Sequence, residues 1–112
     1  MAMEDRRVFA RIKLKIPLRF LDPNTAKECE AETVNISANG VGLITKEKLA
    51  VRTPLEMWLQ IPDHHEPFYT RGEVVWSEAF VDDEYQSVGV CLEDVDLIGL
   101  ARAIRIDNNA TY

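Results

Sequence analysis

Two groups of side chains near the N-terminus have the chemistry to bind a small phosphate-bearing anion. Arg7 and Arg11 lie four residues apart, and an Asn-x-Ser-x-x-Gly run follows at Asn35, Ser37 and Gly40. A guanidinium is planar and always charged, and its fork of donors matches a phosphate or the O6/N7 edge of guanine. Amide and hydroxyl groups add further donors and acceptors, and glycine permits a sharp turn. We therefore expect the two groups to hold one anionic ligand between them.

Each group also has an ordinary structural interpretation. Two surface arginines are common in any protein, and an Asn-Ser turn can simply close a hairpin. The second interpretation is compatible with ligand binding, because a rigid turn is a good platform for polar side chains. The occurrence of both groups in one short chain favours ligand contact over either structural interpretation alone.

The charge is distributed unevenly along the chain. The net charge of −6 argues against a general nucleic-acid binder. Fourteen consecutive positions nevertheless hold six of the thirteen basic residues and no acid: Arg6, Arg7, Arg11, Lys13, Lys15 and Arg19. The other 98 residues carry seven basic and nineteen acidic residues, a net charge of −12. This arrangement favours one small, multiply charged anion as partner. A solvated charge run, or an arm held by the acidic body, is the alternative.

Alternating apolar residues predict a series of short strands that position these side chains. Pro17 faces outward in the first strand, which predicts an edge or a bulge there. Asn39 and Gly40, which tolerate positive φ, predict a hairpin turn. After Asp94 the apolar period becomes helical, at Leu97, Leu100, Ala101 and Ile104, which predicts one amphipathic helix. The expected fold is a small barrel or sandwich with this helix packed on it. The predicted strands are 12–20, 29–36, 41–46, 55–61, 68–77 and 85–92.

The remaining composition predicts an ordinary single globular domain of 112 residues. No apolar run approaches membrane-spanning length, and the acidic start is unlike a signal peptide, so we expect a cytoplasmic protein. Cys29 and Cys91 are expected to be reduced thiols packed as small hydrophobic side chains. His64 and His65 are expected in a solvated loop and make a poor metal site. No side chains have the spacing of a catalytic group, so we expect neither an enzyme nor a cofactor.

The order and spacing of the motifs resemble the PilZ family, whose members are known as receptors for cyclic di-GMP. Besides Arg7/Arg11 and the Asn35–Gly40 run, the segments Arg71–Trp76 and Val88–Leu92 look like the family. The resemblance covers the chain from Glu4 to about Ile106. It implies a mainly β fold, a six-stranded antiparallel PilZ-type β-barrel with a C-terminal α-helix. It also implies a flexible arm at 1–11, the barrel and helix at 12–106, and a loose tail at 107–112.

The resemblance also implies a ligand, cyclic di-GMP, and a set of binding residues. These residues are Arg6, Arg7, Arg11, Asn35, Ser37 and Gly40. In the family, an arginine immediately before the motif accompanies two bound dinucleotides, so Arg6 predicts two molecules per protomer. Trp76 is a candidate for stacking on a guanine, and a core tryptophan is the alternative. The family allows Asp or Asn at the position of Asn35; compared with Asp, Asn35 removes a negative charge near the phosphates and also a carboxylate acceptor for guanine N–H groups.

The expected function is a receptor whose N-terminal arm changes conformation on ligand binding and signals to an unidentified protein, with motility, biofilm or a related output. The expected partners are therefore cyclic di-GMP and that protein, with no DNA or RNA and no membrane insertion. A PilZ-like interaction adaptor that does not need the nucleotide is the alternative. An enzyme acting on the dinucleotide is a second rival, and it would require a metal cluster or general base that the sequence does not show.

Overall fold

The computed structural model of the chain describes residues 11–80, 84–94 and 97–110. The predicted arm, residues 1–11, therefore lies outside the described residues except for Arg11. Arg6 and Arg7, two of the predicted ligand-binding residues, fall in that part, and their contribution remains a prediction.

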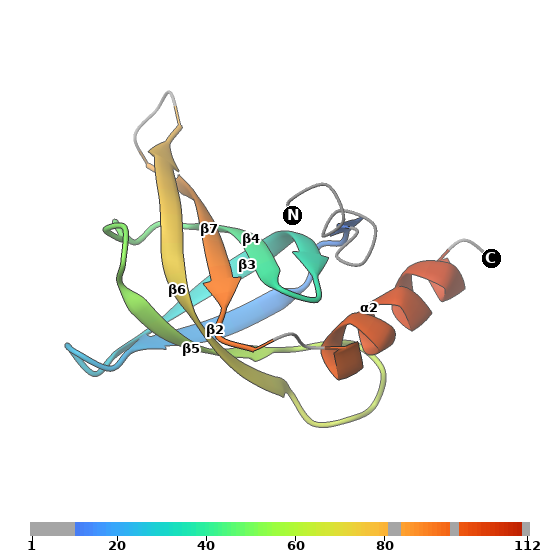
Figure 1. Ribbon diagram of the computed structural model, residues 1–112. Helices are drawn as coiled ribbons and strands as arrows, with labels where there is room; N and C mark the ends of the chain where they lie inside the picture. Colours follow the sequence, from blue (N-terminus) through green and yellow to red (C-terminus); the bar gives the residue numbers. More distant parts are fainter. Residues whose placement is uncertain (1–10, 81–83, 95–96, 111–112) are drawn as a thin grey trace, which may run out of the picture.

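The described residues form a closed antiparallel β-barrel with one helix at its end (Figure 1). Six long strands follow one another around the barrel in the order β3-β2-β5-β6-β7-β4, and pairing of β4 with β3 closes the ring. The predicted fold, a six-stranded antiparallel barrel with a C-terminal helix, is confirmed. The elements are β1 (Ile12–Lys13), β2 (Pro17–Asp22), β3 (Lys27–Ser37), β4 (Gly40–Thr45), β5 (Pro54–Leu59), β6 (Phe68–Ala79), β7 (Gln86–Leu92) and α2 (Leu97–Ala110).

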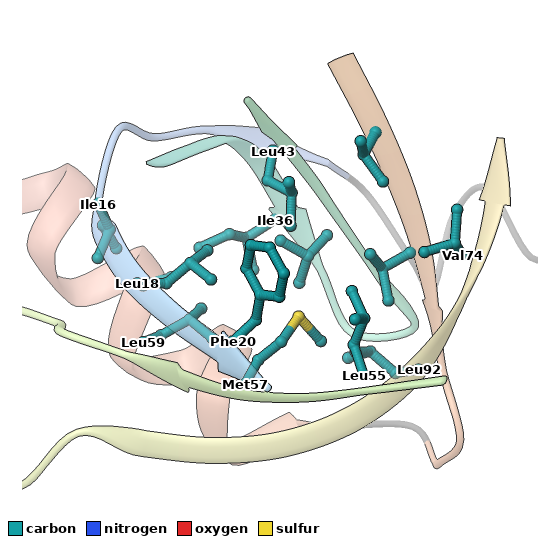
Figure 2. Close-up of a cluster of buried hydrophobic side chains, with 14 of the residues drawn as sticks. Ile16, Leu18, Phe20, Ile36, Leu43, Leu55, Met57, Leu59, Val74 and Leu92 are labelled. Atoms are coloured by element: carbon teal, nitrogen blue, oxygen red, sulfur yellow. The ribbon is translucent and has the colours of Figure 1, made fainter. Parts of the chain in front are cut away.

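The barrel interior is filled by the apolar residues that alternate along the strands. In β2, Leu18 and Phe20 are buried while Pro17 and Arg19 are exposed, which confirms the predicted period of two. Figure 2 shows Phe20 and Met57 at the centre of this cluster, where their strands pair directly. Burial of each such side chain contributes about 1.5–3 kcal/mol. The core therefore supplies a rigid frame for the outward-facing residues.

The first predicted strand, 12–20, is interrupted in the structure, so the prediction of one continuous strand is wrong. The chain leaves the strand conformation after Lys13 and resumes it at Pro17, which is the first residue of β2 and lies between two strands rather than at an edge. Thr33 bridges the interruption, because its hydroxyl accepts from Ile16 N at 2.8 Å and donates to Leu14 O. A buried threonine on the neighbouring strand thus satisfies the backbone N–H of Ile16 and the carbonyl of Leu14, beside the backbone bonds that remain there, and a single-strand pattern does not reveal this.

Helix α2 packs on the barrel through a different face from the one that the sequence predicted. Ala103 is fully buried, and Gly99 lies against the ring of Phe68, where an added Cβ would come within 2.7 Å. Leu97 and Ile104, which the helical apolar pattern assigned to the packed face, are exposed. The helix also continues to Ala110, so residues 107–110 of the predicted loose tail are helical. Small residues let the helix approach closely, and this is why they occupy the packed side.

An ion pair with little solvent exposure fastens α2 to the loop between β5 and β6. Arg102 donates from Nε to Asp63 Oδ2 at 2.6 Å and from Nη2 to Asp63 Oδ1 at 2.7 Å. The same Nη2 donates to the carbonyl of Glu66 at 3.0 Å, and the guanidinium carbon lies 5.9 Å from the Phe68 ring centre. These hydrogen bonds to Arg102 hold the pKa of the Asp63 carboxyl well below its usual range.

Replacing Asp63 by Asn is expected to lower the melting temperature at neutral pH. The pKa of Asp63 is lower in the folded protein, so its stabilising contribution is fully present above the unfolded pKa of about 3.9 and is lost as the pH falls below that value. The difference in melting temperature between wild type and Asp63→Asn should therefore shrink below about pH 4. Thermal melts followed by circular dichroism from pH 3 to 7 measure it. A difference that does not vary with pH would contradict the role of this ion pair.

Candidate functional site

Arg11 and Asn35 meet on the outer face of the barrel. Arg11 Nη1 donates a hydrogen bond to Asn35 Oδ1. The guanidinium also extends over Gly40, where an added Cβ would lie 3.1 Å from Arg11 Nη2 and 3.1 Å from the carbonyl oxygen of Val90. Two residues predicted from separate motifs, 24 positions apart, are thus joined directly. The absence of a side chain at Gly40 leaves the space that the guanidinium uses.

The turn that follows Asn35 is closed by its own side chains. Ser37 is buried, and its hydroxyl lies 3.0 Å from Asn39 Oδ1 and 3.3 Å from the carbonyl oxygen of Gly40, both acceptors for its proton. Ser37 and Gly40 are also directly paired at the ends of β3 and β4. The structure therefore shows Ser37 closing the hairpin, and its contact with a ligand remains a prediction. The predicted hairpin is present, and its turn does not use the positive φ that Asn39 and Gly40 tolerate.

Two β-bulges turn site residues to the outside of the barrel. Pairing shifts in β3 between Thr33 and Asn35, and in β6 between Val74 and Trp76. In each strand the extra residue, Val34 or Val75, is exposed, and the residue after it also faces outward. Strict alternation would have directed Asn35 and Trp76 into the core. The bulges therefore place both side chains on the same outer surface.

Asn35 and Trp76 are the two ends of one row of paired residues that crosses four strands. Asn35 pairs with Gly42, Gly42 with Gly89, and Gly89 with Trp76. An added Cβ at Gly42 would lie 2.9 Å from Asn35 Oδ1, and one at Gly89 would lie 2.1 Å from Trp76 Nε1. The asparagine amide and the indole thus lie over the glycines that separate them. We name Asn35, Gly42, Gly89 and Trp76 the glycine row.

Of the two interpretations of Trp76, a core tryptophan is wrong. Its side chain is 45% exposed and lies on the outer face. Gly42 and Gly89 belong to the glycine row, and we predicted no role for them. Their signal was available, because an isolated glycine within a strand pattern marks a close approach of backbone or side chain. Only the pairing register shows that the two glycines are neighbours.

The charge of Arg11 differs from that of other basic residues in the same run. Lys15 lies 3.6 Å from Glu32, and Arg19 donates to Glu28, so both belong to ion pairs with the acidic body. Arg11 instead contacts the neutral Asn35, and no carboxylate within the described ranges pairs with it. The interpretation of the run as charges held by the acidic body applies to Lys15 and Arg19. At Arg11 the positive charge is open to an anion.

The cysteines and histidines singled out in the sequence form no further site in the described part of the chain. Cys29 is partly buried against the core, whereas Cys91 is exposed, so the packed thiol predicted at Cys91 is wrong. His64 and His65 lie in the predicted loop. Across residues 11–80, 84–94 and 97–110, no three His, Cys, Asp or Glu side chains cluster as a metal site. No helix in these ranges is long and apolar enough to cross a membrane.

Together, the closed barrel, the terminal helix and the hairpin that holds Asn35 and Ser37 define a small β-barrel domain with a polar outer site. The sequence model of the PilZ domain matches residues 5–106, so the chain belongs to the PilZ family. The predicted family is confirmed. A comparison with curated protein sequences gives no significant match.

Solved structures share the fold at low sequence identity. The chain is similar to the PilZ domain of YcgR from Escherichia coli, solved with c-di-GMP, with 11% identity and a TM-score of 0.68 over 94% of both chains. The inhibitor of motility MotI/DgrA of Bacillus subtilis gives 14% identity and a TM-score of 0.70, and the K. pneumonia MrkH–c-di-GMP complex gives 18% and 0.65. The alignments cover 95% of this chain but 52% of either of those proteins, so the chain spans about half their length.

Proposed function

We propose that this protein is a cytoplasmic receptor for cyclic di-GMP. The observation that carries the proposal is the contact of Arg11 with Asn35 above Gly40, which joins both halves of the PilZ signature on one surface. The Arg11 guanidinium, with which no carboxylate of the described residues pairs, lies beside an asparagine amide and offers donors for phosphate oxygens and for a guanine edge. The family membership and the similar structures solved with c-di-GMP support this choice of ligand.

The glycine row offers a second recognition element. Because Gly42 and Gly89 have no side chains, the Asn35 amide and the Trp76 indole lie close against the sheet, and a planar base can contact both from the solvent side. The exposed Trp76 indole presents a ring edge or face for stacking with a guanine. In this arrangement Arg11 binds the phosphates, Asn35 orients the ligand and Trp76 contacts a base.

The arm supplies the conformational signal. Arg6 and Arg7 precede Arg11 without an intervening acid, so their positive charges repel one another in the free protein and are neutralised by a dianionic ligand. Binding then draws the arm onto the barrel surface around Arg11 and Asn35, and a partner protein distinguishes the two states. The output is motility, biofilm formation or a related process.

Titration with cyclic di-GMP separates this function from its rivals. Saturable binding that is lost in Arg7→Ala supports the receptor. The absence of binding by the wild-type protein would point to an interaction adaptor, and disappearance of the dinucleotide during incubation would point to an enzyme. A 20-base-pair DNA duplex added in a parallel titration is expected to give no saturable binding, in keeping with the acidic body of the chain.

If the titration with cyclic di-GMP is followed by calorimetry, it also gives the number of ligands bound per protomer. Arg6 adds a third guanidinium to the arm, which favours two stacked dinucleotides with four phosphates in total. We expect a stoichiometry of two per protomer in the wild type, reduced to one in Arg6→Leu with the binding site otherwise retained. A wild-type stoichiometry of one would contradict the role given to Arg6.

A further inference from the structure

Helix α2 has an apolar face that the barrel does not cover. Ala103 and Gly99 face the barrel, and Leu97 and Ile98, at 62% and 72% exposure, lie on the other side of the helix. At 100° per residue, the exposed residues fall within a third of the helix circumference. These residues, which we name the outer helix face, are Leu97, Ile98, Ala101, Ile104 and Arg105.

A solvent-facing side of a surface helix is normally polar. Four of the five residues on the outer helix face are apolar, and they are contiguous rather than scattered. Contiguous exposed apolar residues of this kind mark an interaction site. They also explain why the apolar pattern of the sequence predicted this side as the packed one.

We propose that the outer helix face binds the same face of a second copy of this chain, as an antiparallel helix pair around Ala101. A two-fold axis at Ala101 brings Ile98 of one copy against Ile104 of the other, and Leu97 against the aliphatic part of Arg105. The small side chain at the centre lets two helices approach to about 8–10 Å between their axes. The axis therefore sets apolar side chains against apolar side chains along the whole face.

The charges at the two ends of the face have the same self-complementarity. Arg105 has no ion-pair or hydrogen-bond partner in the described part of the chain, and neither has the exposed Asp94. Asp94 precedes the start of α2, and Arg105 lies toward its C-terminal end. In an antiparallel pair about Ala101, each Arg105 lies opposite Leu97 of the other copy, three residues along the chain from that copy's Asp94. The ion pair between Arg105 and Asp94 forms twice in the dimer, once at each end of the outer helix face. This arrangement identifies a second copy as the occupant.

Sedimentation velocity of the ligand-free protein over a range of concentrations tests the dimer. The wild type is expected to shift from monomer to dimer as its concentration rises, and Ile104→Glu should weaken association by about tenfold or more. Val51→Glu is the matched control, since Val51 is an exposed apolar residue, 54% exposed, outside α2. Circular dichroism should show that both variants stay folded. A wild type that remains monomeric up to about 1 mM would overturn the proposal, as would equal loss in both variants.

Charge reversal tests the partner and the orientation. Asp94→Arg and Arg105→Asp should each weaken self-association by about fivefold, because like charges then face each other at both ends. An equimolar mixture of the two variants should associate as tightly as the wild type, because every Arg then faces an Asp of the other copy. A mixture that associates no better than either variant alone would overturn the antiparallel pairing. None of these measurements uses cyclic di-GMP, so their outcome is independent of the proposed receptor function.

Discussion

Arg11→Ala is expected to weaken the binding of cyclic di-GMP on the order of 100-fold. In the proposed site, Arg11 supplies charge-assisted hydrogen bonds, each worth about 1.5–3 kcal/mol, and 1.4 kcal/mol corresponds to a factor of ten in affinity. The side chain is exposed and makes its described contact with Asn35 on the barrel surface, so its removal should leave the core unchanged. The variant should therefore melt within experimental error of the wild type while its affinity, measured by calorimetry, falls.

Arg19→Ala is the matched control for this variant. Arg19, on β2, belongs to the same basic run. Its guanidinium donates to Glu28 and lies 5.5 Å from the Trp58 ring centre. Arg19→Ala removes one positive charge, as Arg11→Ala does, but it removes no residue of the proposed site. We expect its affinity to stay within about threefold of the wild type. If both variants weaken binding alike, the arginines act only through overall charge, and the proposed role of Arg11 is wrong.

Gly42→Val is expected to reduce the affinity by about tenfold or more without unfolding the barrel. A Cβ at Gly42 would lie 2.9 Å from Asn35 Oδ1 and 3.1 Å from Nδ2, so the asparagine amide must move. That amide is the end of a flexible side chain, and valine is favoured in strands, so the fold should accommodate the change. The displaced Asn35 would leave the position beside Arg11 from which it is proposed to bind the ligand, and one hydrogen bond lost to a charged ligand corresponds to roughly tenfold in affinity.

Ser87→Val provides a comparison for the glycine variant. Ser87 lies on β7, two residues from Gly89 on the same outer face, and pairs with Ile44 rather than with a residue of the glycine row. The same β-branched side chain is thus added to the same surface outside the row. Calorimetry of both variants should show weakened binding only for Gly42→Val. Normal affinity in Gly42→Val would mean that Asn35 does not need its present position to bind the ligand.

The barrel could be predicted from the sequence because alternation is a local property. Leu18 and Phe20 alternate with Pro17 and Arg19, and this pattern places the first set inside whatever the topology. The two bulges could not be predicted in this way. They depend on how a neighbouring strand pairs, and they reverse the side to which Asn35 and Trp76 face. Because the bulge in β6 was not predicted, the sequence left open whether Trp76 lies in the core or on the outer surface.

The site could be predicted in part for a similar reason. Arg11, Asn35 and Gly40 were identified by residue type and spacing, and the structure brings them together. Gly42 and Gly89 gain their importance from cross-strand pairing, which residue types alone do not encode. The helix shows the converse, because its strongest apolar pattern describes a face that the barrel leaves exposed. A pattern identifies an apolar surface without identifying what covers it.

The most direct test of the proposed site uses the two tryptophans of the chain. Trp76 lies in the glycine row, whereas Trp58 packs between Arg19 and Tyr69 on another part of the outer surface. Each indole N–H gives one signal in a ¹H–¹⁵N spectrum, so one titration with cyclic di-GMP monitors both surfaces at once. We predict that the Trp76 indole signal shifts to saturation while the Trp58 signal stays in place. An unchanged Trp76 signal, or a saturable shift of Trp58 alone, would contradict the site.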